Sequence, residues 1–196
     1  MTPDIVGSIL SFWFEEGIAP GLCEYRPVWF ESTPDIDRQI EERFRSTFEK
    51  AAAGELDHWA GNAPGSLALV IALDQFPRNL FRDGPRAFAT DEMAKSIAVA
   101  AIEQGHDLAL PPLRRIFIYL PFQHSESLED QALSIKLFDS LGKTKVFHFV
   151  QDAARGHREI IARFGRFPHR NTVLGREPTR EEGEFLANPE GKIWTA

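Results

Sequence analysis

Apolar residues recur along most of the chain with the spacing of amphipathic helices. Between 36 and 48 they return every four residues with charged residues between them, which predicts a helix over 34–53 that follows Thr33 and ends at Gly54. Similar patterns, helix-start residues and glycine stops predict further helices at about 3–15, 55–60, 66–75, 90–104, 112–120, 127–142 and 145–164. A Thr-x-x-Glu capping box at 179–182 predicts a short C-terminal helix.

The sequence contains no convincing pattern of β-strands, because alternating runs of Val, Ile and Thr between turn residues are missing. The chain is therefore predicted to be all-α, a single compact domain over 1–196 with about eight or nine helices. Most connections are short, so sequential helices are expected to pack as antiparallel pairs. Segment 165–196 is expected to form a basic loop and a short helix that pack back on this domain.

Two of the predicted helices, 66–76 and 113–122, are apolar nearly all round, which places them in the middle of a helical assembly. Their few charges must then be paired or lie at the rim, and Asp74 is a natural partner for Arg114 and Arg115. Phe-Pro-Arg-Asn follows the first of these helices, and Phe-Pro-His-Arg-Asn follows the last long helix. In both places proline is expected to stop the helix and to hold polar side chains at its end.

Composition and charge narrow the function classes. Lys and Arg number 22 against 29 Asp and Glu, a net charge of −7, which disfavours nucleic-acid or anionic-membrane partners. The longest apolar runs, 67–73 and 116–122, are far shorter than the ~20 residues of a spanning helix. No basic export signal opens the chain, so a cytoplasmic location is expected. The single cysteine, Cys23, excludes an intramolecular disulfide and a Cys-only metal site, and we do not expect it to be a nucleophile.

Three segments, 73–82, 113–126 and 157–171, concentrate the residues that carry chemistry. Arginine forks suit carboxylate and phosphate groups, so a small anionic ligand or a peptide carboxylate is the expected partner. The candidate ligand-binding residues are Arg78, Asn79, Arg115, Arg166, Arg170 and Asn171. The candidate acid–base residues for a catalytic role are Asp74, His124, His157 and His169. The opposing interpretation is that these arginines pair with the surplus of acidic residues.

His157 is the most informative histidine, because it lies four residues from both Ala153 and Ile161 on the apolar stripe of its helix. A histidine there is either a core residue or a functional one, and both interpretations stay open. Two His-x-Glu pairs, at 124–126 and 157–159, have some metal-ligand character. Residues two apart on a helix point to different faces, so neither pair chelates easily and no metal site is predicted. Phosphate-loop and dinucleotide motifs are missing too, and no cofactor is predicted.

The sequence resembles the bacterial and fungal family called DUF924 over nearly its whole length. The likeness lies in LDQFPRNLFR at 73–82, LPPLRRIFIYLPFQHSE at 110–126 and HREIIARFGRFPHRNTVLGRE at 157–177, with FWF at 12–14 and WFES at 29–32. The resemblance implies a TPR-like fold, an α-α superhelix of packed helix pairs. A 34-residue TPR consensus is missing, so the term refers to helix-pair packing only. The biochemical function of the family is unassigned, and the resemblance therefore implies no reaction.

Three functions remain open at this point. The first is a binding module whose arginines capture a peptide carboxylate or another anion. The second is a small-molecule enzyme with Asp and His as acid–base groups and Arg as the anion stabiliser. The third is a buried polar network that only fixes how the helices pack. Polar loops at helix ends favour a ligand-binding pocket, with or without catalysis, over the structural role. The sequence predicts no oligomeric state.

Overall fold

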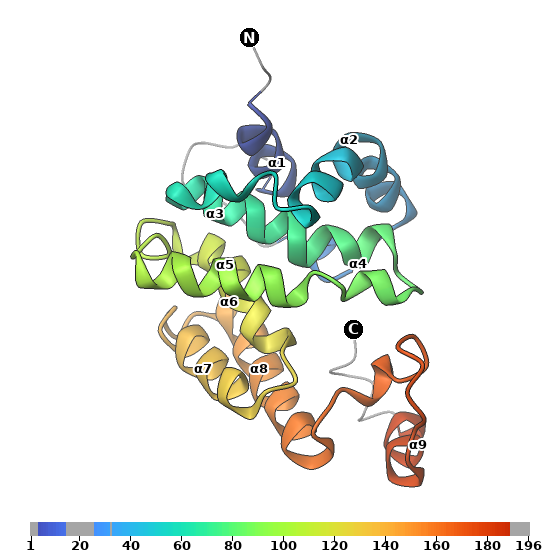
Figure 1. Cartoon of the computed structure of the whole chain (residues 1–196). Helices are drawn as coiled ribbons and strands as arrows, with labels where there is room; N and C mark the ends of the chain where they lie inside the picture. Colours follow the sequence, from blue (N-terminus) through green and yellow to red (C-terminus); the bar gives the residue numbers. More distant parts are fainter. Residues whose placement is uncertain (1–3, 15–25, 32, 189–196) are drawn as a thin grey trace. The chain divides into compact units, whose positions relative to one another are not determined.

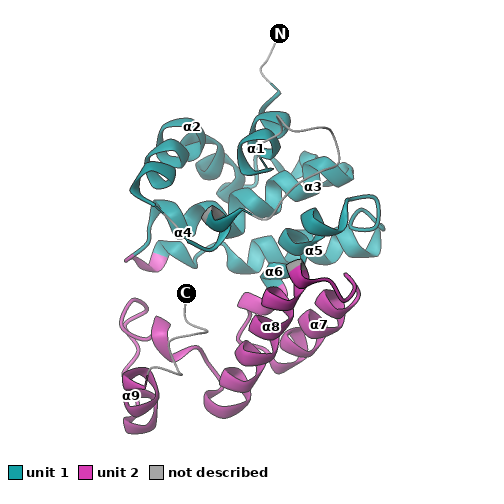
Figure 2. Ribbon diagram, turned by 180° about the vertical axis from the view of Figure 1, so that it is seen from behind, with its two compact units in different colours: residues 1–82, 86–121 teal, residues 83–85, 122–196 magenta. Residues whose placement is uncertain are grey.

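The computed structural model describes residues 4–14, 26–31 and 33–188, and all of its regular elements in these ranges are helices (Figure 1). The all-α prediction is confirmed. The chain divides into two compact units (Figure 2): unit 1 comprises residues 1–82 and 86–121, and unit 2 comprises 83–85 and 122–196. Each unit is described by itself below. No helix among the described residues is long and apolar enough to cross a membrane.

Unit 1 holds most of the helices. Its elements are α1 (Ile5–Phe14), η1 (Pro27–Trp29), α2 (Pro34–Ala52), η2 (Asp57–Gly61), α3 (Ala63–Val70), η3 (Ile71–Gln75), α4 (Phe76–Leu80), η4 (Pro85–Ala87, of which Pro85 is assigned to unit 2), α5 (Asp91–Glu103) and α6 (Pro112–His124, whose last three residues belong to unit 2). The prediction for 34–53 is confirmed as α2, and Thr33 caps it by accepting a hydrogen bond from the Ile36 N–H at 3.3 Å. The predicted helix at 55–60 is wrong in type, because this stretch forms turns and the short 3₁₀ helix η2.

Helices α3, η3 and α4 follow one another without a break, so the expectation that Pro77 stops the helix is wrong. The physical reason is the π-helical turn of η3, which widens the helix just before the proline ring. Pro77 also cannot donate the N–H that the Leu73 carbonyl would accept in an α-helix. The hydroxyl of Thr90 donates to that carbonyl at 2.5 Å. A side chain from outside the helix therefore supports the backbone where proline weakens it.

Pro121 and Pro168 do not end the helices that precede them either. Helix α6 continues through Pro121 to His124, four residues beyond the predicted end at 120. Helix α8 (Lys145–Phe164) ends at Gly165, which takes the left-handed conformation with a φ of 68° that favours glycine. Pro168 instead opens the short 3₁₀ helix η5 (Pro168–Arg170).

The core of unit 1 is rich in aromatic rings. Trp13 meets Phe76 and Phe117 edge to face, with ring centroids 5.8 and 5.7 Å apart. Phe117 also packs against Trp29 at 5.1 Å. The segment Leu67–Leu73 is fully buried, in agreement with its predicted central place. Aromatic pairs of this geometry add to the burial energy, and Trp13 joins the two apolar segments by contacting Phe76 and Phe117.

Unit 2 begins with the end of α6 and continues with α7 (Leu128–Asp139), α8, η5 and α9 (Arg180–Ala187). Helices α7 and α8 lie side by side (Figure 1). Gln151 of α8 donates to the carbonyls of Phe138 and Gly142 and thereby ties the end of α7 and the following turn to α8. Thr179 and Glu182 form the predicted capping box at the start of α9.

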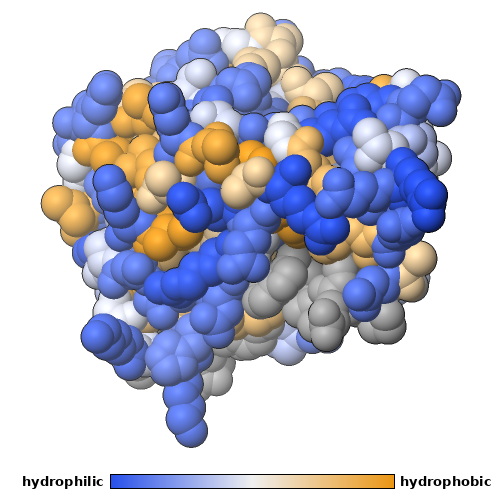
Figure 3. Space-filling view, turned by 90° about the horizontal axis from the view of Figure 1, so that it is seen from below, coloured by the Kyte–Doolittle hydropathy of each residue, from blue (hydrophilic) through white to orange (hydrophobic). Residues whose placement is uncertain are grey.

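The surface carries scattered apolar residues. Among the described residues, the most exposed large apolar side chains are Leu108, Phe149 and Leu128, which are 68%, 50% and 49% exposed. The face shown in Figure 3 sets hydrophobic residues among hydrophilic ones. Single exposed apolar residues of this kind are ordinary on a protein surface.

Candidate functional site

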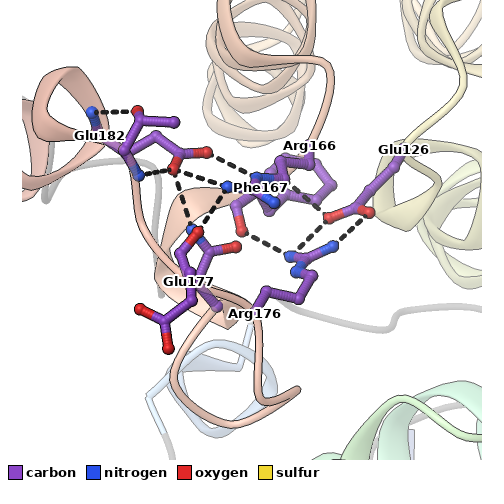
Figure 4. Close-up of polar contacts among 8 residues, drawn as sticks. Glu126, Arg166, Phe167, Arg176, Glu177 and Glu182 are labelled. Atoms are coloured by element: carbon purple, nitrogen blue, oxygen red, sulfur yellow. Dashed lines mark hydrogen bonds and ion pairs between the residues drawn. The ribbon is translucent and has the colours of Figure 1, made fainter.

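Glu126, Phe167 and Arg176 form a closed polar ring in unit 2 (Figure 4). Arg176 donates from Nη1 to Glu126 Oε2 at 2.8 Å and from Nη2 to Oε1 at 3.1 Å. The Phe167 N–H donates to Glu126 Oε1 at 2.8 Å, and the Phe167 carbonyl accepts from Arg176 Nη2 at 3.0 Å. The second and third segments singled out in the sequence therefore meet here.

The partners of Glu126 keep its carboxylate ionised. Burial by itself would raise the pKa of Glu126, but hydrogen bonds from Arg176 and the Phe167 N–H outweigh it, and the pKa lies below its ordinary value. Arg170 adds a smaller electrostatic contribution in the same direction. A single carboxylate thus interacts with two guanidinium groups.

The ring of Phe167 is the centre of a cluster of cationic and imidazole side chains, which we call the Phe167 cluster. His157 of α8 meets the Phe167 ring edge to face at 5.2 Å between centroids, and His169 of η5 lies at 5.5 Å. The Arg170 guanidinium lies 4.5 Å from the ring centroid, within cation–π distance. The members of the Phe167 cluster are Glu126, His157, Phe167, His169, Arg170 and Arg176.

Electrostatics keep His169 neutral in this cluster. Burial is the largest cause that lowers its pKa, to about 3, followed by the positive charge of Arg170 and by His157. Glu126 opposes this lowering, and Arg176 adds a smaller lowering effect. Two buried nitrogens of the cluster, His169 Nδ1 and Arg176 Nε, have no hydrogen-bond partner among the described residues. Buried polar atoms of this kind are uncommon in folded proteins and are often explained by a ligand, an ion or a water molecule.

Glu182 is the centre of a second group of polar contacts in unit 2 (Figure 4). Arg166 donates from Nε to Glu182 Oε1 at 2.6 Å and from Nη2 to Oε2 at 2.8 Å. Asn171 and the Thr179 N–H donate to Oε2 at 3.2 and 2.6 Å. The Arg166 hydrogen bonds are the first cause that lowers the pKa of Glu182, to about 2, with help from the Thr179 N–H. Two of the predicted ligand-binding residues, Arg166 and Asn171, are thus engaged in anchoring α9.

The first segment builds a separate network in unit 1. Arg78 of α4 donates to Asp91 through both terminal nitrogens, at 3.0 and 3.1 Å, and its Nη1 lies 3.5 Å from Asp74 Oδ1. Arg78 also donates to the Asp74 carbonyl, and Gln75 donates to Asp74 Oδ2 at 2.5 Å. Asp74 is fully buried, and Arg78, which contacts it, comes from the same segment of the chain. Asn79 donates to Asp37 at 2.8 Å.

The remaining predicted residues have other surroundings. Arg115 donates to the carbonyls of Leu110 and Leu108 at 2.8 and 3.2 Å, so the expected pairing of Arg115 with Asp74 is wrong. The physical reason is that two carbonyls of the turn before α6 accept from this guanidinium and take up its donors. His124 is half-buried at the last position of α6. Cys23 lies outside the described residues.

Sequence reasoning missed Glu126, Arg176 and Glu182 as organising residues. Glu126 stood in a segment of interest, but only as part of a His-x-Glu pair. Glu182 stood out only as the last residue of a capping box. Neither acid has a local signal that sets it apart, because Glu129 and Asp130 follow Glu126, and Glu181 and Glu184 flank Glu182. Among the described residues, no group of three or more His, Cys, Asp or Glu side chains is placed to hold a metal ion.

Comparisons with known proteins confirm the family resemblance found in the sequence. A protein of unknown function from Agrobacterium tumefaciens has a similar structure, with a TM-score of 0.83 and 40% sequence identity over 93% of this chain and 96% of that one. No curated protein shows significant sequence similarity to the chain. The family model described as "Bacterial protein of unknown function (DUF924)" matches residues 9–190. Since this match covers nearly the whole sequence, the chain belongs to the DUF924 family.

Proposed function

We propose that unit 2 binds a small oxyanion, a carboxylate or phosphate of a small ligand or peptide, at the Phe167 cluster. The charge balance of the cluster supports this proposal. The cluster contains two guanidinium groups, Arg170 and Arg176, and two imidazoles, His157 and His169, against the one carboxylate of Glu126. Arginine and histidine N–H groups are the donors that oxyanions prefer in proteins.

The observation that carries the proposal is that two buried nitrogens of the Phe167 cluster, His169 Nδ1 and Arg176 Nε, have no hydrogen-bond partner in the described part of the chain. Leaving a buried N–H unsatisfied costs about 1–3 kcal/mol, which an oxyanion oxygen would recover. A neutral imidazole can carry its proton on Nδ1 and donate it. Both atoms are shielded from solvent, so the proposal requires the loop that carries them to open when the ligand enters.

Binding is favoured over acid–base catalysis by the state of His169. An imidazole whose pKa lies at about 3 is neutral at pH 7 and is a weak base, whereas general bases work best near neutral pKa. Arg78, Arg115 and Arg166 take no part in the proposed site, because they lie outside the Phe167 cluster and their hydrogen bonds go to other carboxylates and carbonyls of the protein. For those three arginines we propose the structural role.

The test is the melting temperature of the pure protein with sodium phosphate, sulfate or acetate, compared with sodium chloride at the same ionic strength. A ligand that binds only the folded state stabilises it by RT ln(1 + [L]/Kd). We expect phosphate or sulfate to raise the melting temperature of the wild type by several degrees. Isothermal titration calorimetry then gives the affinity.

Three variants locate the site. Arg170→Gln removes a guanidinium from the Phe167 ring and should abolish the shift, whereas Arg158→Gln, an exposed arginine of the same region, should preserve it. Arg170→Lys keeps the positive charge and should retain part of the shift, which separates lost binding from lost folding. If no oxyanion stabilises the wild type, or if Arg170→Gln binds as well as Arg158→Gln does, the proposal is wrong.

A further inference from the structure

We infer that oxyanion binding at the Phe167 cluster is coupled to the uptake of one proton by His169. This inference rests on the proposed function and adds the protonation state of His169 in the complex with the oxyanion. His169 lies against one aromatic ring together with His157 and Arg170, 5.5 Å from the Phe167 centroid. Its Nδ1 is one of the two buried nitrogens that would face the ligand.

The groups around His169 come from four parts of unit 2, and most of them oppose a positive charge on it. Arg170 lies beside it in η5, His157 faces it from α8, and Arg176 belongs to the following loop. Glu126, after the end of α6, is the one acid that favours the charged form. Burial acts in the same direction as the arginines. Without a bound oxyanion, the imidazole of His169 is therefore neutral at pH 7.

An oxyanion in contact with Nδ1 reverses this balance. Its negative charge lies closer to the imidazole than Glu126 does and offsets the two arginines, so the pKa of His169 rises on binding. A protonated imidazole donates from both ring nitrogens, whereas a neutral one donates from a single nitrogen. The proton comes from solvent and goes onto the imidazole, and no covalent bond of the ligand changes.

Linkage fixes the sign of the pH dependence. If the bound form holds one more proton than the free form, the association constant rises as pH falls, by up to about tenfold per pH unit. This dependence begins at the pKa that His169 has with the oxyanion bound. It extends down toward the pKa that His169 has without the oxyanion, which is about 3. A ligand held by arginines alone would show a nearly flat profile over the same range.

The experiment is calorimetric titration of the wild type with sodium sulfate between pH 5.5 and 8 at constant ionic strength. Sulfate carries no proton in this range, so any proton taken up goes onto the protein. Each titration is repeated in two buffers of different ionisation enthalpy, which gives the number of protons directly. We expect uptake to increase toward one proton as pH falls.

Three variants assign the proton. His169→Gln retains a side-chain N–H but cannot be protonated, and should bind sulfate with little pH dependence. His148→Gln, an exposed histidine of α8, should keep both binding and uptake. His157→Gln, at the second imidazole of the cluster, should bind sulfate more weakly and still take up a proton for each sulfate bound. Uptake that survives in His169→Gln, or that is lost only in His157→Gln, overturns the assignment.

The outcomes separate this inference from the proposed function. Sulfate binding without proton uptake overturns the proton coupling and leaves oxyanion binding intact. Failure of both sulfate and phosphate to bind the wild type overturns both. Binding with uptake that requires His169 supports both.

Discussion

The carboxylate of Glu126 and the guanidinium of Arg176 form a two-point ion pair although 50 residues separate them in the sequence. The two nitrogen–oxygen distances are 2.8 and 3.1 Å. The backbone of Phe167 joins the pair, since its N–H donates to Glu126 and its carbonyl accepts from Arg176. The pair therefore fixes the position of the ring on which His157, His169 and Arg170 gather.

The Glu126–Arg176 ion pair is partly buried, so it should stabilise the fold more than an exposed ion pair does. Glu126→Gln leaves a half-buried guanidinium with a weaker acceptor, and we expect a loss of about 2 kcal/mol in the free energy of unfolding. Chemical denaturation measures this loss. Glu159→Gln, which changes an exposed glutamate of α8, is the matched control and should cost less than about 0.5 kcal/mol.

A double-mutant cycle tests whether the loss belongs to this pair. The combined variant Glu126→Gln/Arg176→Gln should be less destabilised than the sum of the single variants, because each single change already breaks the same interaction. Strict additivity would mean that the two residues act independently and would contradict the assignment.

Glu182 should make unit 2 sensitive to acid. Its pKa lies at about 2 in the folded protein, below the ordinary glutamate value of 4.5, mainly because Arg166 hydrogen-bonds to the carboxylate. A carboxylate with a lowered pKa stabilises the fold above the unfolded pKa, and that stabilisation is lost as pH falls from about 4.5 toward 2. Glu182→Gln should therefore lower the melting temperature by several degrees at pH 7 and flatten its decline on acidification.

Thermal unfolding monitored by circular dichroism between pH 7 and pH 2.5 measures this effect. Glu181→Gln changes the neighbouring glutamate, whose side chain is 61% exposed, and should leave the acid profile close to that of the wild type. Parallel profiles for the wild type and Glu182→Gln would show that this carboxylate does not govern the acid response.

The helices could be predicted from the sequence because their signals are local. The four-residue apolar repeat before Gly54 and the apolar stripe around His157 gave α2 and α8 nearly to the residue. Thr33 and Thr179 cap their helices as expected. A cap or an amphipathic face depends on residues three or four apart, which a single sequence contains in full.

The polar networks could not be predicted in the same way, because their partners come from distant parts of the chain. Nothing near Glu126 in the sequence indicates that Arg176, rather than another arginine, binds it. A local rule predicts that Pro77 stops the helix. The π-helical turn before it and the hydrogen bond from Thr90 depend on tertiary packing, which that rule does not include. Tertiary contacts overrode a local rule at this position.

Thr90 should matter through its hydroxyl group. It is 5% exposed, and its Oγ1 donates to the Leu73 carbonyl at the place where Pro77 removes a backbone donor. Thr90→Val keeps the shape but leaves the buried carbonyl without this donor, so we expect a loss of about 1–3 kcal/mol. Thr90→Ser keeps the hydroxyl and should lose less. Equal losses in both variants, measured by denaturant unfolding, would assign the effect to packing of the methyl group.

Arg78 should be sensitive to replacement by lysine, although the charge is unchanged. Its guanidinium reaches both oxygens of Asp91 and, from the same nitrogen, the carbonyl and carboxylate of Asp74, which is fully buried. An ammonium group cannot make these planar, two-point contacts, so Arg78→Lys should lower the free energy of unfolding by about 2 kcal/mol.

Arg82→Lys supplies the comparison within the same segment. Arg82 also binds an aspartate, Asp37, but its side chain is 45% exposed, against 23% for Arg78. Exposed ion pairs contribute about 0–1 kcal/mol, and water solvates either cation well. The two variants should therefore differ by more than about 1 kcal/mol in denaturant unfolding. If Arg82→Lys were as damaging as Arg78→Lys, proximity to the buried Asp74 would not be what makes Arg78 important. The contacts of Arg78 with Asp74 and Asp91 would then contribute no more to stability than the exposed Arg82–Asp37 pair does.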